Sequence, residues 1–289
     1  MANLIPISYL QTDSRWSNMD YSAKGESTTI GKAGCGPTSC AMVVASLVDN
    51  SVTPVNACTY SLAHGFKAKN QGTYYSFIRS YLQEYGIEAV QLNQSNLYKK
   101  ASSIHDKALK AIKDGDWVIC CMGKGNWTSS GHFILWYDIE GELALVKDPN
   151  STKTSRTRNK VSLLQNEVKY YWHVKVNDFL NKKKDSDEMI TNREVEIFGK
   201  NVTTEGILKE GKNFLSPRML EQVGLKVSSQ GSKPIISMND VKVSVDDKIA
   251  TVDGFSVNGT NYVPIRAIAE MLDCSVDFDN STKTILIQR

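Results

Sequence analysis

Hydrophobic positions in the first part of the chain form short apolar runs of two kinds. The run AMVVASLV at 41–48 follows small and polar residues, a pattern typical of a buried helix. The runs WVICCM at 117–122, HFILWYD at 132–138 and VKYYWHV at 168–174 are instead typical of strands. This arrangement predicts an α+β domain in which a helix precedes an antiparallel sheet.

The pattern changes beyond residue 178. The stretch NDFLNKKKDSDEMITN mixes three consecutive lysines with acidic and small polar residues. Because three charges make a short block, a solvated linker is the simpler interpretation and a specific basic patch the alternative. We therefore predict a first domain at 1–178, a linker at 179–188 and a second domain at 189–289.

The second domain repeats itself, with copies at 189–238 and 239–289. The alignment pairs Gly211 with Gly259 and Arg218 with Arg266, a period long enough for a small supersecondary unit. Each copy is expected to form two short strands around a Gly turn, a helix of about ten residues and a further strand pair. The two copies are expected to pack together, and Arg266 and Glu270, four residues apart, to form an ion pair.

Composition narrows the class of protein. With 289 residues, 41% of them hydrophobic and 22% charged, the chain suits two globular domains rather than a disordered protein. No apolar stretch approaches the roughly 18 residues of a membrane span, and the start of the chain lacks the pattern of a secretory signal. A net charge of +3 is too small to indicate nucleic-acid binding, but it suits, weakly, work on an anionic polymer such as a cell wall.

Cys35 lies between two glycines, directly before the predicted buried helix. Pro37 suits a first helical turn, so we place Cys35 at the amino terminus of that helix. Free backbone N–H groups and the helix dipole stabilise a thiolate there and lower the thiol pKa. A cysteine before a helix is more often structural than catalytic, so its assignment as a nucleophile depends on its partners.

His132 and Asp148 are the candidate partners. His132 opens a predicted strand after a polar loop, and Asp148 ends the next strand. Because a short turn between antiparallel strands brings their far ends together, we expect the carboxylate to hold the imidazole. Taken singly, such a His is more often an ordinary core or surface residue, and Asp-Pro often ends a strand in a turn.

Gln11, in YLQTDSRW, is a candidate donor, because its side-chain amide and the Cys35 backbone N–H would together make an oxyanion hole. The segments QTDSRW, GCGPTSCAM, GHFIL and KDPN then resemble, in order and content, papain-like cysteine peptidases of family 39, which include the bacteriocin-leader-processing (double-glycine) peptidases. The resemblance covers roughly residues 5–175. It implies a papain-like fold with Cys35 as nucleophile, His132 as general base and acid, Asp148 as orienting residue and Gln11 as oxyanion donor. This thiol mechanism requires no metal or other cofactor.

The sequence also departs from that group. Processing peptidases are normally fused to an exporter, whereas this sequence has neither a membrane span nor a GxxxxGK[ST] loop, which disfavours a leader-processing role. Trp16, Trp127 and Tyr74 are candidates for lining a substrate groove, although such aromatic residues are more often part of the core. The five cysteines other than Cys35 are expected to be buried thiols.

The second copy of the repeat, NGTNYVPIRAIAEMLDCSVDFDNSTKTILI, resembles the small module named after the amino-terminal domain of copper amine oxidases. That module is appended to many surface and cell-wall proteins of Gram-positive bacteria. The resemblance covers 239–289 well and 189–238 loosely, and it implies attachment rather than chemistry. The region holds no His and only one Cys, Cys274, so no copper site is expected.

Together these features predict a peptidoglycan hydrolase, a thiol peptidase or amidase that cuts an amide bond of the bacterial cell wall and is held there by residues 189–289. A catalytic unit followed by a repeat module is the plan of phage endolysins and autolysins. An endolysin would stay in the host cytoplasm until release, and a secreted or surface-associated enzyme is the alternative. A processing peptidase for leader peptides or other proteins, and a non-catalytic wall-binding protein, remain as other functions. Self-association through the repeats is also open.

Overall fold

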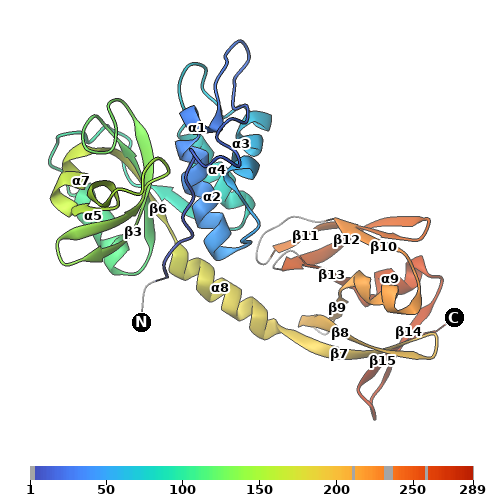
Figure 1. Cartoon of the computed structure of the whole chain (residues 1–289). Helices are drawn as coiled ribbons and strands as arrows, with labels where there is room; N and C mark the ends of the chain where they lie inside the picture. The colour runs from blue at the N-terminus through green and yellow to red at the C-terminus, as the bar shows by residue number, and fades with distance from the viewer. Residues whose placement is uncertain (1–3, 210–211, 231–236, 258–259, 289) are drawn as a thin grey trace. The chain divides into compact units, whose positions relative to one another are not determined.

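The computed structural model describes four stretches of the chain: 4–209, 212–230, 237–257 and 260–288 (Figure 1). The chain divides into two compact units, Met1–Phe179 and Leu180–Arg289. Each unit has its own buried hydrophobic cluster. The folding of each unit can therefore be understood from its own sequence.

Unit 1 begins with a helical lobe (Figure 1). The lobe consists of α1 (Ile30–Ala33), α2 (Cys35–Leu47), α3 (Pro54–Ala63) and α4 (Ser76–Glu84). Helix α2 is buried along almost its whole length, as its apolar sequence predicts, and packs against α3 and α4. Thr53 and Asn56 form a reciprocal capping box that starts α3.

The second lobe of unit 1 is a six-stranded antiparallel sheet in the order β1-β6-β2-β3-β4-β5. Its strands are β1 (Ala89–Gln91), β2 (Trp117–Met122), β3 (His132–Glu140), β4 (Leu143–Lys147), β5 (Arg158–Lys160) and β6 (Val168–Val174). Helices α5 (Ile104–Lys113) and α7 (Val161–Glu167) pack against this sheet. Every residue of β2 is buried, because β2 pairs with a neighbour on each side and is covered by helix. The predicted α+β class is confirmed.

The residues predicted to link the domains are helical. Helix α8 spans Val176–Met189 and contains all of 179–188. The three lysines therefore lie on a regular element, in a helix whose middle is rich in charged residues. No described helix combines the length and the apolar character that crossing a membrane requires.

Unit 2 is built on one nine-stranded sheet in the order β10-β11-β12-β13-β9-β8-β7-β15-β14. The first copy of the repeat supplies β7 (Ile190–Ile197), β8 (Lys200–Lys209), β9 (Lys212–Leu215), the 3₁₀ helix η1 (Pro217–Val223) and β10 (Val227–Gln230). The second copy supplies β11 (Ser237–Val245), β12 (Lys248–Val257), β13 (Thr260–Pro264), α9 (Ile265–Met271), β14 (Ser275–Asp279) and β15 (Thr284–Gln288).

The two copies are interleaved as well as adjacent. Strand β10 of the first copy pairs with β11 of the second, while β15 of the second pairs in parallel with β7 of the first. Strand β13 pairs with β9 at the junction between the two. The copies therefore pack together, as predicted, by exchanging their last strands.

Three details of the repeat prediction are wrong. Each copy has three strands before its helix instead of two, and each helix has seven residues instead of about ten. Left-handed backbone follows shortly after each helix, at Gly224 (φ 90°) and Asp273 (φ 55°), where the chain turns out of the helical path.

The third error is the ion pair predicted on the helix of the second copy. Arg266 and Glu270 form no salt bridge, because Arg266 faces residues of β7 and β15 across a hollow and Glu270 lies beside β12.

Candidate active site

Cys35 is the first residue of α2, as its glycine-flanked sequence predicts, and its side chain is partly exposed. The two glycines on either side of Cys35 allow contacts that are too close for a residue with a Cβ atom. A Cβ on Gly34 would lie 2.6 Å from the Ile30 carbonyl oxygen, and a Cβ on Gly36 would lie 3.3 Å from Phe133. Gly36 thus lets the start of α2 approach strand β3 closely, which brings Cys35 to the sheet, while Gly34 allows close packing against α1.

His132 and Asp148 meet at one end of the β3–β4 hairpin. His132 is the first residue of β3, and Asp148 directly follows the last residue of β4. The His132 Nε2 atom lies 2.6 Å from Asp148 Oδ1, and both side chains are almost completely buried. Because Nε2 is occupied by Asp148, Nδ1 is the ring nitrogen that remains for Cys35.

The pKa values of Cys35 and His132 are shifted toward one another. Burial alone would raise the thiol pKa of Cys35, but a hydrogen bond from His132, its charge, and the backbone N–H groups of Phe133 and Gly36 hold that pKa below its usual value. Burial would lower the pKa of His132, but hydrogen bonds to Asp148 and Cys35 raise it to about 9. Both shifts favour the ion pair of thiolate and imidazolium over the neutral pair of thiol and imidazole.

Arg156 is a member of this network that the sequence analysis missed. It lies in the short helix α6 (Thr154–Thr157), and its Nε donates to Asp148 Oδ2 at 2.6 Å. The Arg156 guanidinium also donates to the Trp127 carbonyl, while the Trp127 indole N–H donates back to the Arg156 carbonyl at 2.8 Å. Asp148 Oδ1 accepts a further bond from the Asn150 N–H. The buried carboxylate is thus fixed on both oxygens.

Family models match both units. The model described as Peptidase_C39 like family matches residues 12–177, and the model described as Copper amine oxidase N-terminal domain matches 196–287. The chain belongs to the Peptidase_C39 like family. The protein is thus a cysteine peptidase, and its second unit is similar to a domain known from copper amine oxidases.

A comparison with solved structures finds peptidases that are similar to part of this chain, while no curated protein matches the chain. A double glycine motif protease from an AMS/PCAT transporter, solved with a leader peptide, is 15% identical with a TM-score of 0.36, over 60% of this chain and 94% of its own. The peptidase domain of Streptococcus ComA is 16% identical with a TM-score of 0.33, over 50% and 91%. A C39-like peptidase from Bacillus anthracis is 14% identical with a TM-score of 0.34, over 50% and 90%.

Gln11 of the peptidase is anchored on two sides of the Cys35–His132 pair. Its backbone N–H donates to the Pro149 carbonyl, next to Asp148, and its side-chain Nε2 donates to the Gly31 carbonyl, four residues before Cys35. The amide carries a second N–H, and its Oε1 is buried without a partner among the described residues. Gln11 therefore lies beside the site, with hydrogen-bonding capacity left for a substrate.

Two of the three aromatic residues predicted to line a substrate groove are core residues instead. Trp16 and Trp127 are 3% and 1% exposed, and their indole N–H groups bond to the carbonyls of Leu10 and Arg156. A buried indole that donates to backbone in this way has no face left for a substrate. Tyr74 is 54% exposed, so its place in a groove stays a prediction.

Four of the five remaining cysteines, Cys40, Cys58, Cys120 and Cys121, are buried as predicted. Cys274 is half-buried. Burial raises the thiol pKa of all four buried cysteines, and that of Cys121 to about 11. The pKa of Cys35 is thus shifted in the opposite direction from those of the buried thiols, although Cys40 lies on the same helix.

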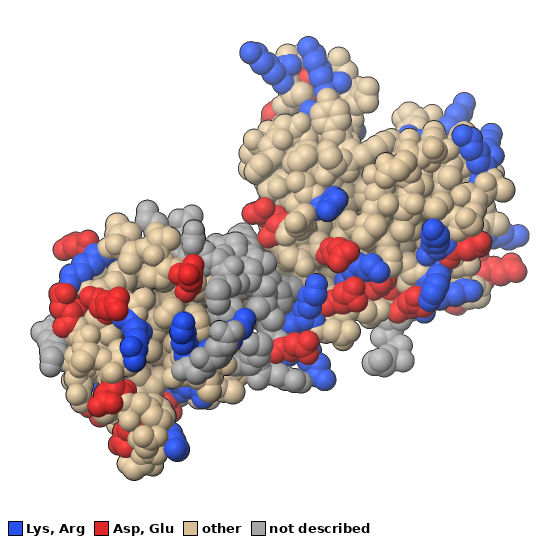
Figure 2. All heavy atoms as spheres, turned by 180° about the vertical axis from the view of Figure 1, so that it is seen from behind, with Lys and Arg blue, Asp and Glu red and all other residues tan. Residues whose placement is uncertain are grey.

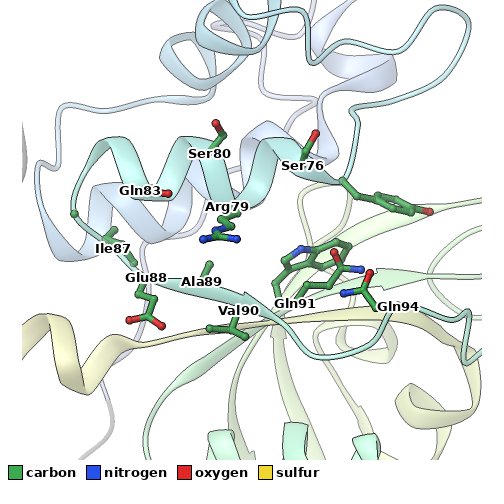
Figure 3. A pocket seen from close by; sticks show the side chains of 13 residues that line it. Ser76, Arg79, Ser80, Gln83, Ile87, Glu88, Ala89, Val90, Gln91 and Gln94 are labelled. Carbon is green, nitrogen blue, oxygen red and sulfur yellow. The ribbon is translucent and has the colours of Figure 1, made fainter.

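The peptidase has a polar pocket near this site that the sequence analysis did not find (Figure 3). The pocket measures about 860 Å³ and lies between helix α4 and strand β1. Tyr75 and Trp172 also line it. The Tyr75 ring lies 6.0 Å from that of Phe133, whose backbone N–H reaches the Cys35 sulfur. Tyr75 and Phe133 therefore link the pocket to the surroundings of Cys35.

The walls of this pocket carry groups suited to a polar ligand. Figure 3 shows Arg79 on the helix side, with Glu88, Gln91 and Gln94 on the strand side and beyond it. On the face of the molecule in Figure 2, Lys and Arg side chains are mixed with Asp and Glu over much of the surface. Neither sign of charge dominates among the described residues of this face.

Proposed function

We propose that this peptidase is a peptidoglycan hydrolase, which cuts an amide bond of the bacterial cell wall with Cys35 as nucleophile. The observation that carries the catalytic part is the Cys35–His132–Asp148 network, in which the thiol pKa is lowered and the imidazole pKa raised. The cell-wall part is supported by the second unit, a repeat module without His that suits attachment. The combination is that of phage endolysins and autolysins of Gram-positive bacteria.

In the proposed mechanism the Cys35 thiolate attacks the carbonyl carbon of the scissile amide. The Cys35 backbone N–H and the free N–H of Gln11 stabilise the tetrahedral oxyanion. The imidazolium of His132 then protonates the leaving amine, and the neutral ring activates the water that hydrolyses the thioester. Asp148 keeps the ring oriented throughout, so the same nitrogen serves both proton transfers.

The polar pocket beside Tyr75 supports a substrate with many hydrogen-bonding groups. Arg79 and Glu88 offer one charge of each sign, and Gln91 and Gln94 offer amides. A wall stem peptide carries carboxylates, amides and an amine, which these groups match. The second unit would hold the enzyme on the wall, where it acts after release from the host cytoplasm or after secretion, and the repeats would also be the site of any self-association.

The test is loss of turbidity of purified Gram-positive cell walls with wild-type protein, Cys35→Ala and the control Cys40→Ala. Cys40 lies on the same helix but is a buried thiol with a raised pKa, so its replacement removes a thiol without touching the chemistry. Mass spectrometry of the released fragments identifies the bond that is cut. A leader-type peptide with a Gly-Gly site is incubated in parallel.

Lysis by wild type and Cys40→Ala, but not by Cys35→Ala, is the expected result. Intact walls together with cleavage of the leader-type peptide would replace the proposal by a processing peptidase. Wall binding without cleavage of either substrate would leave a non-catalytic wall-binding protein.

A further inference from the structure

Unit 2 contains a hollow of about 1030 Å³ whose lining is rich in positive charge. It lies between strands β7, β8, β9, β14 and β15 and the start of α9, elements labelled in Figure 1. Its basic residues are Arg193, Lys212, Arg266 and Lys283, and we call it the cationic hollow. Asp277 is the one carboxylate among the described residues that line it. The lining therefore has a formal charge of three positive units.

Arg193 points into this hollow from the inner face of the sheet. Side chains alternate along a strand, so Arg193 shares one face of β7 with Val195 and Ile197, both fully buried in the core of unit 2. Gly206 on the adjacent strand makes room for it, because a Cβ there would lie 2.9 Å from Arg193 Cγ. An arginine on a core-facing position is costly unless its charge has a partner.

That partner is missing from the described protein. The Nε of Arg193 is buried and has no hydrogen-bond partner among the described residues. None of the four cations of the hollow forms a salt bridge with a described carboxylate. The Asp277 carboxylate accepts a bond from the Phe278 backbone N–H instead. The charge of the hollow is therefore available to an external anion.

Apolar side chains flank the cations. Leu208 is 53% exposed and Phe278 is 43% exposed, and both line the hollow together with the buried Ile265 and Ile285. Arginine guanidinium groups match the oxygens of phosphate in a bidentate way, while exposed apolar side chains contact carbon chains. A ligand in which phosphates alternate with short carbon segments fits both features.

The charges of the hollow are only partly repeated at the equivalent positions of the two copies. In the alignment of the two copies, Val241 and Thr260 stand where the first copy has Arg193 and Lys212. Only Arg218, the counterpart of Arg266, retains a positive charge at these three positions. Two of the four positive charges that line the hollow, those of Arg193 and Lys212, thus have uncharged counterparts in the second copy, which a general need for solubility would not explain.

We propose that the cationic hollow binds a polymer of phosphodiester-linked polyols on the cell wall. The proposal rests on the wall attachment suggested under the proposed function, and it names the chemistry that unit 2 recognises. Arg193 and Arg266 bind the phosphate oxygens, Lys212 and Lys283 add charge at the rim, and Leu208 and Phe278 contact the polyol carbons. Phosphodiesters also occur in lipid headgroups, and the experiment separates these two sources.

The experiment measures co-sedimentation of the full chain with walls that carry a glycerol-phosphate polymer, and with the same walls stripped of it by hydrofluoric acid. All proteins carry Cys35→Ala so that the walls stay intact. The variants are Arg193→Gln and Arg266→Gln, and the matched control is Arg218→Gln, which removes the same charge at the equivalent position of the other copy. Vesicles of phosphatidylglycerol form a third arm.

We expect Arg193→Gln and Arg266→Gln each to weaken binding to polymer-bearing walls by about tenfold, since each loses a charge-assisted contact. Arg218→Gln is expected to bind like the parent, stripped walls to bind weakly, and salt to weaken the parent's binding. Equal binding to stripped walls, equal loss with Arg218→Gln, or binding to vesicles alone would overturn the proposal. Cleavage of stripped walls by protein with Cys35 intact is scored separately, so a failed binding site and a failed hydrolase give different results.

Discussion

The active site of unit 1 and the cationic hollow of unit 2 hold their charges in opposite ways. In unit 1 the Asp148 carboxylate is fully buried and is bonded to both His132 and Arg156. In unit 2 Arg193 and its three cationic neighbours have no carboxylate partner among the described residues. A closed network sets pKa values and fixes geometry, whereas unpaired charges on a hollow are available to a ligand. The predictions below test whether this difference determines what each region does.

The largest effect is expected from removing the imidazole that touches the thiol. His132→Gln should lower kcat/KM on the order of 10⁴-fold. The variant removes the positive charge that stabilises the thiolate, and it removes the acid that protonates the leaving amine. The control is His173→Gln, since His173 Nε2 also bonds an aspartate, Asp116, at 2.7 Å but has no thiol beside it. Peptide hydrolysis at neutral pH provides the measurement.

His173→Gln should leave kcat/KM within a few-fold of wild type. If the two variants lost activity equally, the His–Asp pairs would matter for folding rather than for chemistry, and the assignment of His132 would fail. Circular dichroism of both variants separates these cases.

The next effect concerns the buried ion pair that orients the site. Arg156→Ala should lower the unfolding free energy of unit 1 by about 3 kcal/mol, because it leaves a buried carboxylate without its cation. Arg158→Ala, two residues along, breaks an exposed pair with Glu140 and should cost about 0.5 kcal/mol or less. All five tryptophans lie in unit 1, so tryptophan fluorescence in urea follows the unfolding of that unit alone.

Activity should distinguish a positioning role for Arg156 from a purely structural one. Arg156→Lys keeps the positive charge but not the second hydrogen-bond donor. It should therefore be more stable than Arg156→Ala. Its kcat should stay about tenfold below that of the wild type, with KM little changed. Equal losses of stability for Arg156→Ala and Arg158→Ala would contradict the buried network described here.

Cys35, His132 and Asp148 were predictable because each stands at the end of an element whose limits can be read from the sequence. Cys35 precedes a long apolar helix after a Gly, and His132 and Asp148 begin and follow the strands of a hairpin. A position at the end of an element implies where the side chain lies in space. The predicted domain and repeat boundaries depend on the same kind of reasoning, because their patterns are local.

Arg156 was not predictable in this way. It lies in a four-residue helical turn, and only the folding of the loop after β4 returns it to Asp148. Trp127 was misassigned to a groove because the sequence does not distinguish a buried indole from an exposed one. The contact that shows Trp127 to be a core residue is its indole hydrogen bond to the Arg156 carbonyl. Both errors involve contacts made by loops, where no periodic pattern reports on burial.

A smaller effect, about tenfold for each pH unit on either side of the optimum, is expected from titrating the thiolate–imidazolium pair. Activity should fall as pH drops through the lowered pKa of Cys35, because the thiolate is protonated. It should also fall as pH rises through about 9, because His132 loses the proton that the leaving amine needs. A profile of kcat/KM against pH, with iodoacetamide labelling of Cys35, provides the measurement. An acid limb near the pKa of an ordinary thiol would show that the pair is not preformed.

The smallest effect is expected in unit 2, where a charge can be removed without breaking a bond. Arg193→Gln and Arg266→Gln should change the unfolding free energy by less than about 0.5 kcal/mol, since neither cation forms a salt bridge with a residue in the described stretches. Relief of repulsion among the four positive charges acts in the opposite direction, so a slight gain in stability is the more informative result. Unit 2 contains no tryptophan, so its unfolding is followed by circular dichroism. A loss of several kcal/mol would mean that these arginines hold the fold together, and the contrast with Asp148 and Arg156 would disappear.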